Sequence, residues 1–351
     1  DGSLADVEFF NVAYKSNEKN AVHARAPARI TFGGGGSDKL DFFKTSRGLC
    51  INAAIKKYAF CTLCEPDDGC VVQIVSSDYQ YDWKYQKIEE FFDAMVPRLL
   101  IYKNVMSFMD YDWPIKIITH CDFPIGSGLG GSSALTVALL HAFNELGGSS
   151  VSKLRLAQDA YKLERLAMGI NGGWQDQYVA AVGGINALHF SKEKHDVHNL
   201  KLDDGILREL EASLYLCFSG LSHDSSQIHN GIDLSENDRA LRMQETVRLA
   251  TEMLSSLTNA DLNNFDRNMN ENWALKKQYS DKISNVELDE QIRGFRESGA
   301  TSVKILGAGG GGYFLARVPI QSQHTFSKFC SVNNILPERV TFDYEGVVSW
   351  I

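Results

Sequence analysis

The fold is decided by the stretch from Asp122 to Gly147, which reads D-F-P-I-G-S-G-L-G-G-S-S-A-L-T-V-A-L-L-H-A-F-N-E-L-G. A cluster of glycines comes first, two serines follow, and an apolar run then begins. In that run, hydrophobic side chains recur at i, i+4, i+7 and i+8, the spacing of an amphipathic helix with a buried stripe: Leu135, Leu139, Ala142 and Phe143. The stretch therefore predicts a glycine loop that leads into a helix.

Such a loop is suited to binding phosphate. The first N–H groups of a helix lack an acceptor within the helix, and the positive end of the helix dipole lies behind them. Glycine lets a pyrophosphate approach the backbone because it has no Cβ. We expect Ser132 or Ser133 to be the N-cap of the helix and Gly147 to be its C′ glycine.

Two better-known phosphate loops fit less well. The stretch has no lysine before its serines, so it is not a Walker loop. Gly126, Gly128 and Gly131 match G-x-G-x-x-G, but Pro124 separates them from the preceding strand. A dinucleotide site also needs an acidic residue at the end of a second strand roughly 20 positions on, where this chain is still helical. A glycine-rich turn without a ligand remains the alternative.

Three ordered motifs resemble those of one enzyme family. P-I-G-S-G-L-G-G-S-S-A resembles the second motif of the GHMP kinases, which include galactokinase, homoserine kinase and mevalonate kinase. The first motif is similar to R-A-P-A-R-I-T-F-G-G-G-G-S-D (Arg25 to Asp38), and the third to I-L-G-A-G-G-G-G-Y (Ile305 to Tyr313). G-G-W-Q-D-Q-Y-V-A-A-V-G-G (Gly172 to Gly184) and the ending F-D-Y-E-G-V-V-S-W-I resemble the D-glycero-D-manno-heptose 7-phosphate kinases. The likeness covers nearly the whole chain from about Arg25.

The resemblance implies an α+β chain with the GHMP kinase fold and two α/β domains. Residues 1–22 are expected to be a polar N-terminal lead. Residues 23–204 would form the ATP-binding N-terminal domain, similar to the second domain of ribosomal protein S5. Residues 205–351 would form a ferredoxin-like C-terminal domain. The active site is expected in the cleft between the two domains, with glycine loops from both sides.

The resemblance also implies ATP and Mg²⁺ as cofactors and assigns site residues. The catalytic pair would be Asp176 and Arg29, and the Mg²⁺ ligands Ser133 and Glu164. The ATP loop would consist of Pro124, Gly126, Gly128, Leu129, Gly130, Gly131, Ser132 and Ser133. The substrate would contact Gly34, Gly35, Gly36, Ser37, Asp38, Gly173, Gln175, Tyr178, Gly309 and Gly310.

Three acidic residues also have interpretations that need no ligand. Asp38 follows four glycines and suits a turn or an N-cap. Asp176 lies in the first turn of the helix expected over 174–182, where the helix dipole favours a carboxylate. Glu164 lies at the edge of a small, apolar helix face and needs a partner there. Arg165 or Lys162 could supply it, but the resemblance favours a metal ion.

The implied reaction is transfer of the γ-phosphoryl group of ATP to a sugar hydroxyl. By resemblance, this is the anomeric hydroxyl of D-glycero-D-manno-heptose 7-phosphate, giving the 1,7-bisphosphate for nucleotide-activated heptose. A fucokinase- or galactokinase-like enzyme acting on an unphosphorylated sugar is the alternative. A non-catalytic sugar and ATP sensor is a third reading, against which the joint presence of Ser133, Glu164, Asp176 and Arg29 argues.

One departure from the family pattern concerns the substrate phosphate. Family members often have a serine–arginine pair where this chain has Ser222-His223-Asp224. If that arginine normally holds the substrate phosphate, either another cation replaces it or the substrate is a different sugar or sugar phosphate. The sequence does not choose among four candidates: Lys39, Lys44, Arg47 and Lys304.

Composition and net charge limit the classes of partner that the protein is expected to bind. The 351 residues carry a net charge of −9, which argues against a general nucleic-acid or anionic-membrane surface. No transmembrane span or signal peptide is recognisable, so we expect a cytoplasmic protein that binds ATP and a small sugar or sugar phosphate. A homodimer is left open.

Cys61 and Cys64 form C-x-x-C within a predicted strand, which is poor geometry for zinc and favours free thiols.

Outside the motifs, periodicity and turn signals predict the remaining elements. Strands are expected over 24–32, 50–64, 70–83, 114–121, 302–306, 313–318 and 339–344, with 50–64 and 70–83 paired through a Pro-Asp-Asp-Gly turn. Helices are expected over 89–109, 152–168 with Ser152 as N-cap, 174–182, 236–257, 261–279, 286–298 and 321–333.

Overall fold

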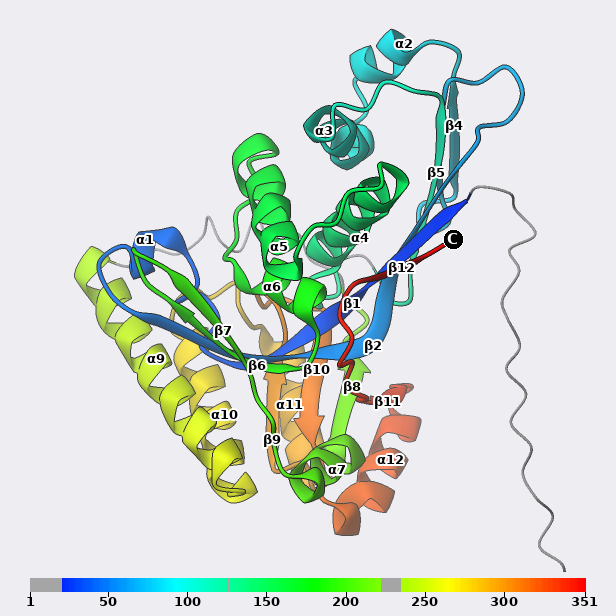
Figure 1. Cartoon of the computed structure of the whole chain (residues 1–351). Helices are drawn as coiled ribbons and strands as arrows, with labels where there is room; N and C mark the ends of the chain where they lie inside the picture. Colours follow the sequence, from blue (N-terminus) through cyan, green and yellow to red (C-terminus); the bar gives the residue numbers. More distant parts are fainter. Residues whose placement is uncertain (1–20, 125, 222–234) are drawn as a thin grey trace, which may run out of the picture.

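The computed structural model of the protein describes residues 21–124, 126–221 and 235–351. Within these residues, the larger of two sheets has eight strands in the order β12-β1-β2-β5-β3-β4, with β6 on β2 and β7 on β6 (Figure 1). Its strands are β1 (Val22–Gly33), β2 (Gly48–Cys64), β3 (Val72–Ser76), β4 (Tyr81–Tyr85), β5 (Ile115–Cys121), β6 (Ile185–Phe190), β7 (His195–Asn199) and β12 (Val348–Trp350). Among the described strands of this sheet, β3 and β5 are the one parallel pair, and the other pairs are antiparallel.

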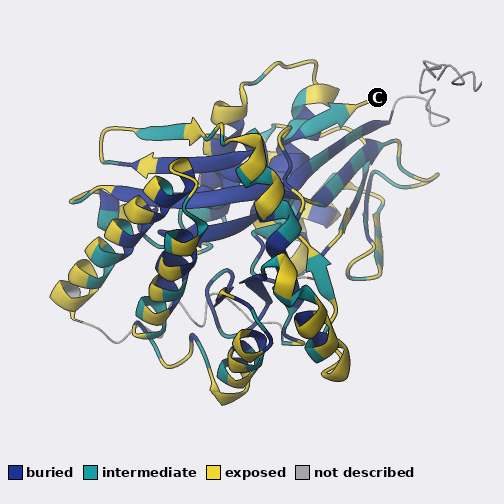
Figure 2. Cartoon of the chain, turned by 90° about the horizontal axis from the view of Figure 1, so that it is seen from below, coloured by how far each residue is buried: buried dark blue, intermediate teal, exposed yellow. Residues whose placement is uncertain are grey.

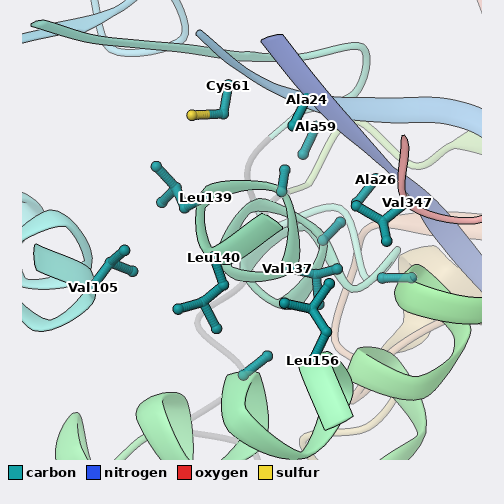
Figure 3. Packing of buried hydrophobic residues seen from close by; sticks show 14 of the residues in the cluster. Ala24, Ala26, Ala59, Cys61, Val105, Val137, Leu139, Leu140, Leu156 and Val347 are labelled. Atoms are coloured by element: carbon teal, nitrogen blue, oxygen red, sulfur yellow. The ribbon is translucent and has the colours of Figure 1, made fainter. Parts of the chain in front are cut away.

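Helix α4 (Gly131–Leu146), which follows the glycine loop, packs on this sheet. Small residues of β1 and β2, such as Ala24 and Ala59, let the helix come close (Figure 3). Val137, Leu139 and Leu140 fill the space between these strands and the neighbouring helices. Almost every position of α4 from its third residue to Phe143 is buried or half-buried, so the helix is central rather than amphipathic with a single buried stripe.

Further helices cover the same face of the sheet (Figure 1). They are α1 (Leu40–Phe43), α2 (Ile88–Asp93), α3 (Leu100–Phe108), α5 (Lys153–Tyr161) and α6 (Gln175–Val182). Ser152 caps α5 as predicted, because its side chain accepts a hydrogen bond from the backbone N–H of Arg155. A π-helical turn over Lys162–Ala167 continues α5 and carries Glu164.

The smaller sheet has the order β11-β8-β10-β9 and is antiparallel. Its strands are β8 (Leu214–Phe218), β9 (Ser302–Ile305), β10 (Tyr313–Arg317) and β11 (Pro337–Arg339), accompanied by α7 (Asp204–Ser213), α9 (Glu236–Thr258), α10 (Leu262–Lys277), α11 (Val286–Glu297) and α12 (Gln323–Val332). Strands β8, β9 and β10 are almost wholly buried, whereas the edge strand β11 is not. Figure 2 shows that helices expose their outward faces. A buried ion pair joins α10 to this sheet: the Nε of Arg317 donates to Asp266 Oδ1 at 2.7 Å.

Several predicted elements are confirmed, and three are wrong. The strands over 24–32 and 114–121 and the long helices after residue 235 are present. The single helix over 89–109 is instead two helices, because Pro97 interrupts it and starts a 3₁₀ turn. The prediction of one strand over 70–83 in a hairpin with 50–64 is also wrong. This segment forms two strands, β3 and β4, that pair with each other, and β5 lies between β2 and β3.

The third error is at the C-terminal end. The strand predicted over 339–344 stops at Arg339 in β11, and Phe342 makes only an isolated bridge to Ile55. The chain then returns to the large sheet, where β12 pairs with β1 (Figure 1). At the other end, residues 1–20 of the predicted polar lead lie outside the described residues, whereas Val22 already belongs to β1. The domain boundary at 204/205 stays a prediction. Among the described helices, none is long and apolar enough to cross a bilayer.

Candidate functional site

Arg29 of β1 connects the elements of the site. Its Nε donates to Asp176 Oδ1 at 2.7 Å and its Nη2 to Asp176 Oδ2 at 2.9 Å, a bidentate pair. The third arm of the guanidinium, Nη1, donates to the carbonyl of Gly128. The backbone N–H of Arg29 also donates to the carbonyl of Leu129 at 3.0 Å. One side chain and its own backbone thus join β1, the glycine loop and the start of α6.

The glycine loop enters α4 without a side-chain cap. Gly130 is the N-cap and adopts a left-handed conformation (φ 76°), so the prediction that Ser132 or Ser133 caps the helix is wrong. Both serines lie in the first turn, and their side chains turn toward Glu164 instead. At the other end, Gly147 is the C-cap, and Gly148 is the residue with positive φ. The first N–H groups of α4 point out of its N-terminus beside Arg29.

The loop residues around this N-terminus are packed against the third motif. The backbone N–H of Tyr313 donates to the carbonyl of Ser127 at 3.0 Å. A Cβ on Gly128 would lie 2.7 Å from the carbonyl oxygen of Leu306, so the two glycine loops can touch only because neither has side chains there. Gly309 and Gly310 lie against Ile283, whose carbonyl accepts from the N–H of Gly310. Their predicted contact with a substrate stays a prediction.

Glu164 is fully buried and bonded by three side chains. Its Oε1 accepts from the hydroxyl of Ser132 at 2.7 Å, and its Oε2 from the hydroxyl of Ser133 at 2.7 Å and from Gln177 Nε2. Gln177 Nε2 also lies 3.0 Å from Ser133 Oγ. The sequence missed Gln177, although it follows Asp176 by one residue in the matched W-Q-D-Q-Y. Gln177 thus links Ser133 to Glu164 from the position next to Asp176 in α6.

Neither cation that the sequence offered to Glu164 is bonded to it. Lys162 pairs with Asp159 at the surface, with Nζ and Oδ1 3.4 Å apart. The guanidinium of Arg165 donates to the carbonyls of Ile170 and Gly173, each at 3.4 Å. The buried carboxylate is held by neutral donors alone among the described residues, an arrangement that leaves its charge available to a cation.

Asp38 positions the start of α6. Its Oδ2 accepts from the backbone N–H of Gln175 at 3.1 Å and its Oδ1 from the N–H of Gly36 at 2.9 Å. A Cβ on Gly173 would lie 1.9 Å from Asp38 Oδ2, so this close approach requires glycine. Trp174 stacks on Tyr161, with ring centroids 3.4 Å apart. Asp38 thus accepts from a backbone N–H of its own turn and from the start of α6 but does not cap the adjacent helix, whose N-cap is Lys39, and its sugar contact stays a prediction.

Other residues predicted to contact the substrate are placed differently. Ser37 is buried, and its hydroxyl oxygen accepts from the N–H of Leu49 at 3.0 Å. Gln175 accepts from the hydroxyl of Thr31 at 2.9 Å and lies beside Gly35. Tyr178 lies in the hydrophobic core, where its hydroxyl bonds to His195 Nδ1 at 3.1 Å. The structure therefore brings Gln175 to the site and places Tyr178 in the core behind it.

Two lysines approach the site from the C-terminal domain. Lys304 of β9 is buried, and its Nζ donates to the carbonyl of Phe32 at 2.9 Å. Lys276, at the end of α10, donates to the carbonyl of Gly307. Burial first, and then neighbouring cations that include Arg29, lower the pKa of Lys304 to about 7 and that of Lys276 to about 8. In the part of the chain that the structure describes, neither lysine forms an ion pair with a carboxylate.

Some predicted features lie elsewhere or outside the described residues. Surface cavities of about 300 and 390 Å³ are lined by residues such as Trp273 and Asn263 of the C-terminal domain and include none of the predicted site residues. His223, where the family pattern departs, lies outside the described residues. The seven cysteines all lie in the described part of the chain, and none of them forms a disulfide there.

The chain matches known proteins over nearly its full length. The family model "GHMP kinases N terminal domain" matches residues 100–184, and "GHMP kinases C terminal" matches residues 253–325. The chain is 31% identical over 337 residues to the D-glycero-alpha-D-manno-heptose 7-phosphate kinase of Campylobacter jejuni, which covers 94% of this chain and 98% of that protein.

Two further relatives are informative. The crystal structure of a D-glycero-D-manno-heptose 1-phosphate kinase from Bacteroides thetaiotaomicron has a TM-score of 0.77 and 27% identity, covering 94% of this chain and 99% of that one. The bifunctional fucokinase/GDP-fucose pyrophosphorylase of Arabidopsis thaliana is 26% identical over 308 residues, which are 82% of this chain but 29% of that protein.

The first relative covers both chains almost completely, and the three glycine-rich motifs meet around Arg29. The predicted two-domain α+β architecture is confirmed together with them. The chain therefore belongs to the GHMP kinases, phosphotransferases that act on an alcohol group.

Proposed function

We propose that this kinase transfers the γ-phosphoryl group of ATP to the anomeric hydroxyl of a heptose 7-phosphate. The observation that carries the transfer chemistry is the bidentate Arg29–Asp176 pair beside the N-terminus of α4. It places a carboxylate next to a set of backbone N–H groups suited to phosphate. The identity of the sugar rests on the relative from Campylobacter jejuni and on the motifs that resemble heptose 7-phosphate kinases.

Different residues of the site have different roles in phosphoryl transfer. The loop from Gly128 to Ser133 and the first turn of α4 hold the phosphates of ATP through backbone N–H groups. Asp176 accepts or orients the proton of the attacking hydroxyl. Arg29 fixes both oxygens of that carboxylate and adds positive charge where negative charge develops on the transferred group.

The chemistry of the donors around Glu164 fits Mg²⁺. Ser133 and Glu164 offer hard oxygen atoms, and Mg²⁺ needs only one or two carboxylates when phosphate and water complete its shell. Gln177 Oε1 beside them is buried and lacks a hydrogen-bond partner in the described structure, so a further oxygen there is unsatisfied. When bound, Mg²⁺ neutralises charge on the β and γ phosphates.

We also propose a cytoplasmic location, because the cysteines of the described residues form no disulfide, as is usual in a reducing compartment.

The acceptor is tested by measuring ADP release with D-glycero-D-manno-heptose 7-phosphate, fucose, galactose and mevalonate. We expect the highest kcat/KM with heptose 7-phosphate and a new phosphate at the anomeric oxygen by ³¹P NMR. A higher value with fucose would instead favour the fucokinase-like alternative, to which the Arabidopsis relative gives some support. Absence of ADP release with every acceptor would favour a sensor.

The role of Asp176 is tested by Asp176→Asn. The amide keeps the size of the side chain but cannot accept the hydroxyl proton, so we expect kcat to fall about 10²–10⁴-fold while the KM for ATP changes little. Asp196→Asn is the control, because this carboxylate pairs with Lys194 at the surface of β7. An unchanged kcat in Asp176→Asn would remove Asp176 from the mechanism.

The role of Glu164 is tested by Glu164→Gln in a Mg²⁺ titration of activity. Loss of the negative charge weakens the proposed metal site, so we expect a higher Mg²⁺ concentration at half-maximal rate. Glu145→Gln is the matched control, since Glu145 lies near the opposite end of α4 and bonds to Ser349. Identical titrations for Glu164→Gln and the wild type would exclude the ligand role.

A further inference from the structure

The cations around the three glycine loops differ in how they are paired. The charge of Arg29 is matched by Asp176, whereas Lys276 and Lys304 have no carboxylate partner among the described residues. Lys304 is only 4% exposed. A buried charge without a counter-ion is costly, and the cost shows in the lowered pKa of both lysines. Two such lysines at one place indicate that an anion completes the site.

Both ammonium groups lie where the three motifs meet. Lys304 is bonded to the carbonyl of Phe32, the residue just before the first glycine loop. Lys276 is bonded to the carbonyl of Gly307, in the third loop, which touches Gly128 of the second. Lys276 lowers the pKa of Lys304, and Arg29 lowers the pKa of both lysines, so the three cations share one electrostatic neighbourhood.

Lys304 of β9 contacts β1 at Phe32, and this point of contact favours the acceptor over ATP as the source of the anion. Phe32 is three residues beyond Arg29, which is about 10 Å along a strand. The phosphates of ATP are expected at the α4 N-terminus on the Arg29 side, whereas the loop after Phe32 is the expected sugar site. A phosphate at the far end of a seven-carbon sugar is separated from the anomeric hydroxyl by the length of the sugar.

We propose that Lys276 and Lys304 bind the phosphate that the acceptor sugar already carries, so that the enzyme selects a sugar phosphate over the free sugar. This inference rests on the proposed function and names the anchor that the sequence left open at His223. Ammonium groups suit this role because each offers three donors and here uses one on a carbonyl.

Selectivity is tested with Lys276→Met and Lys304→Met, which keep side-chain length and remove the charge. The ratio of kcat/KM for heptose 7-phosphate to that for the unphosphorylated heptose should fall about 10- to 100-fold in each variant, as expected for loss of a hydrogen bond to a charged group. Lys277→Met is the matched control, because the next residue of α10 pairs with Asp289 at the surface. Its ratio should equal that of the wild type.

The outcomes separate this inference from the proposed function. If the wild type phosphorylates heptose 7-phosphate and both variants keep its selectivity, the inference is wrong and the function stands. An increased KM for ATP with unchanged selectivity would assign the lysines to ATP and also overturn it. If the wild type prefers the free sugar, the heptose 7-phosphate assignment fails, and the lysine anchor fails with it.

The same lysines give the ligand-free enzyme a pH-dependent stability. Their pKa in the unfolded chain is about 10.4 and is lower in the folded protein, so the unfolded chain binds more protons between about pH 7 and pH 10. The free energy of unfolding therefore rises with pH in that window. The groups that face them are Arg29 and Cys50 for Lys304, and Arg29 and Lys39 for Lys276.

We expect the Tm of the wild type to rise between about pH 7 and pH 9 more steeply than that of the Lys276→Met/Lys304→Met double variant. At about pH 7 the double variant should also have the higher Tm, because it no longer carries the unmatched charges. Thermal unfolding followed by circular dichroism measures both. Equal slopes in the two proteins would contradict a buried, unmatched lysine pair.

Discussion

The guanidinium of Arg29 is the interaction on which the site depends. Its Nε and Nη2 donate to the two carboxylate oxygens of Asp176, and its Nη1 donates to the carbonyl of Gly128. A lysine at this position could supply charge but not three donors in a fixed plane. Arg29 belongs to β1, a buried strand of the large sheet. Its guanidinium therefore holds α6 and the glycine loop in fixed positions relative to that sheet. The N-termini of α4 and α6 are thereby held beside one another.

The sequence predicted the structure best where a feature depends on one contiguous stretch of residues. Residues 115–121 alternate as a strand, the glycines follow, and a helix begins, so the phosphate loop was predictable from its own stretch. The family motifs then placed Asp176 and Glu164 with the loop. Side-chain partners were less predictable, because hydrogen bonds depend on geometry across elements. Gln177 carries no pattern that marks it as the residue linking Glu164 to Ser133.

The errors in the fold have a common physical origin in long-range pairing. A Pro-Asp-Asp-Gly turn predicts a reversal of the chain, but it does not say which strand will lie alongside. Here β5 is inserted between β2 and β3, and β12 returns from the far end of the chain to β1. The broken helix at Pro97 is different, since the missing N–H of proline was visible in the sequence.

The buried charges of the site come from different parts of the fold. Glu164, a buried carboxylate held by neutral donors, lies on the α5 side of Asp176, and the lysine pair enters from the C-terminal domain. An acid without a cation and two cations without an acid are each unfavourable in the empty protein. A metal-bound nucleotide beside Glu164 would supply the missing positive charge, and a phosphorylated acceptor beside the two lysines would supply the missing negative charge. Under both proposals, binding of the two ligands would supply the counter-charges that these buried groups lack in the ligand-free protein.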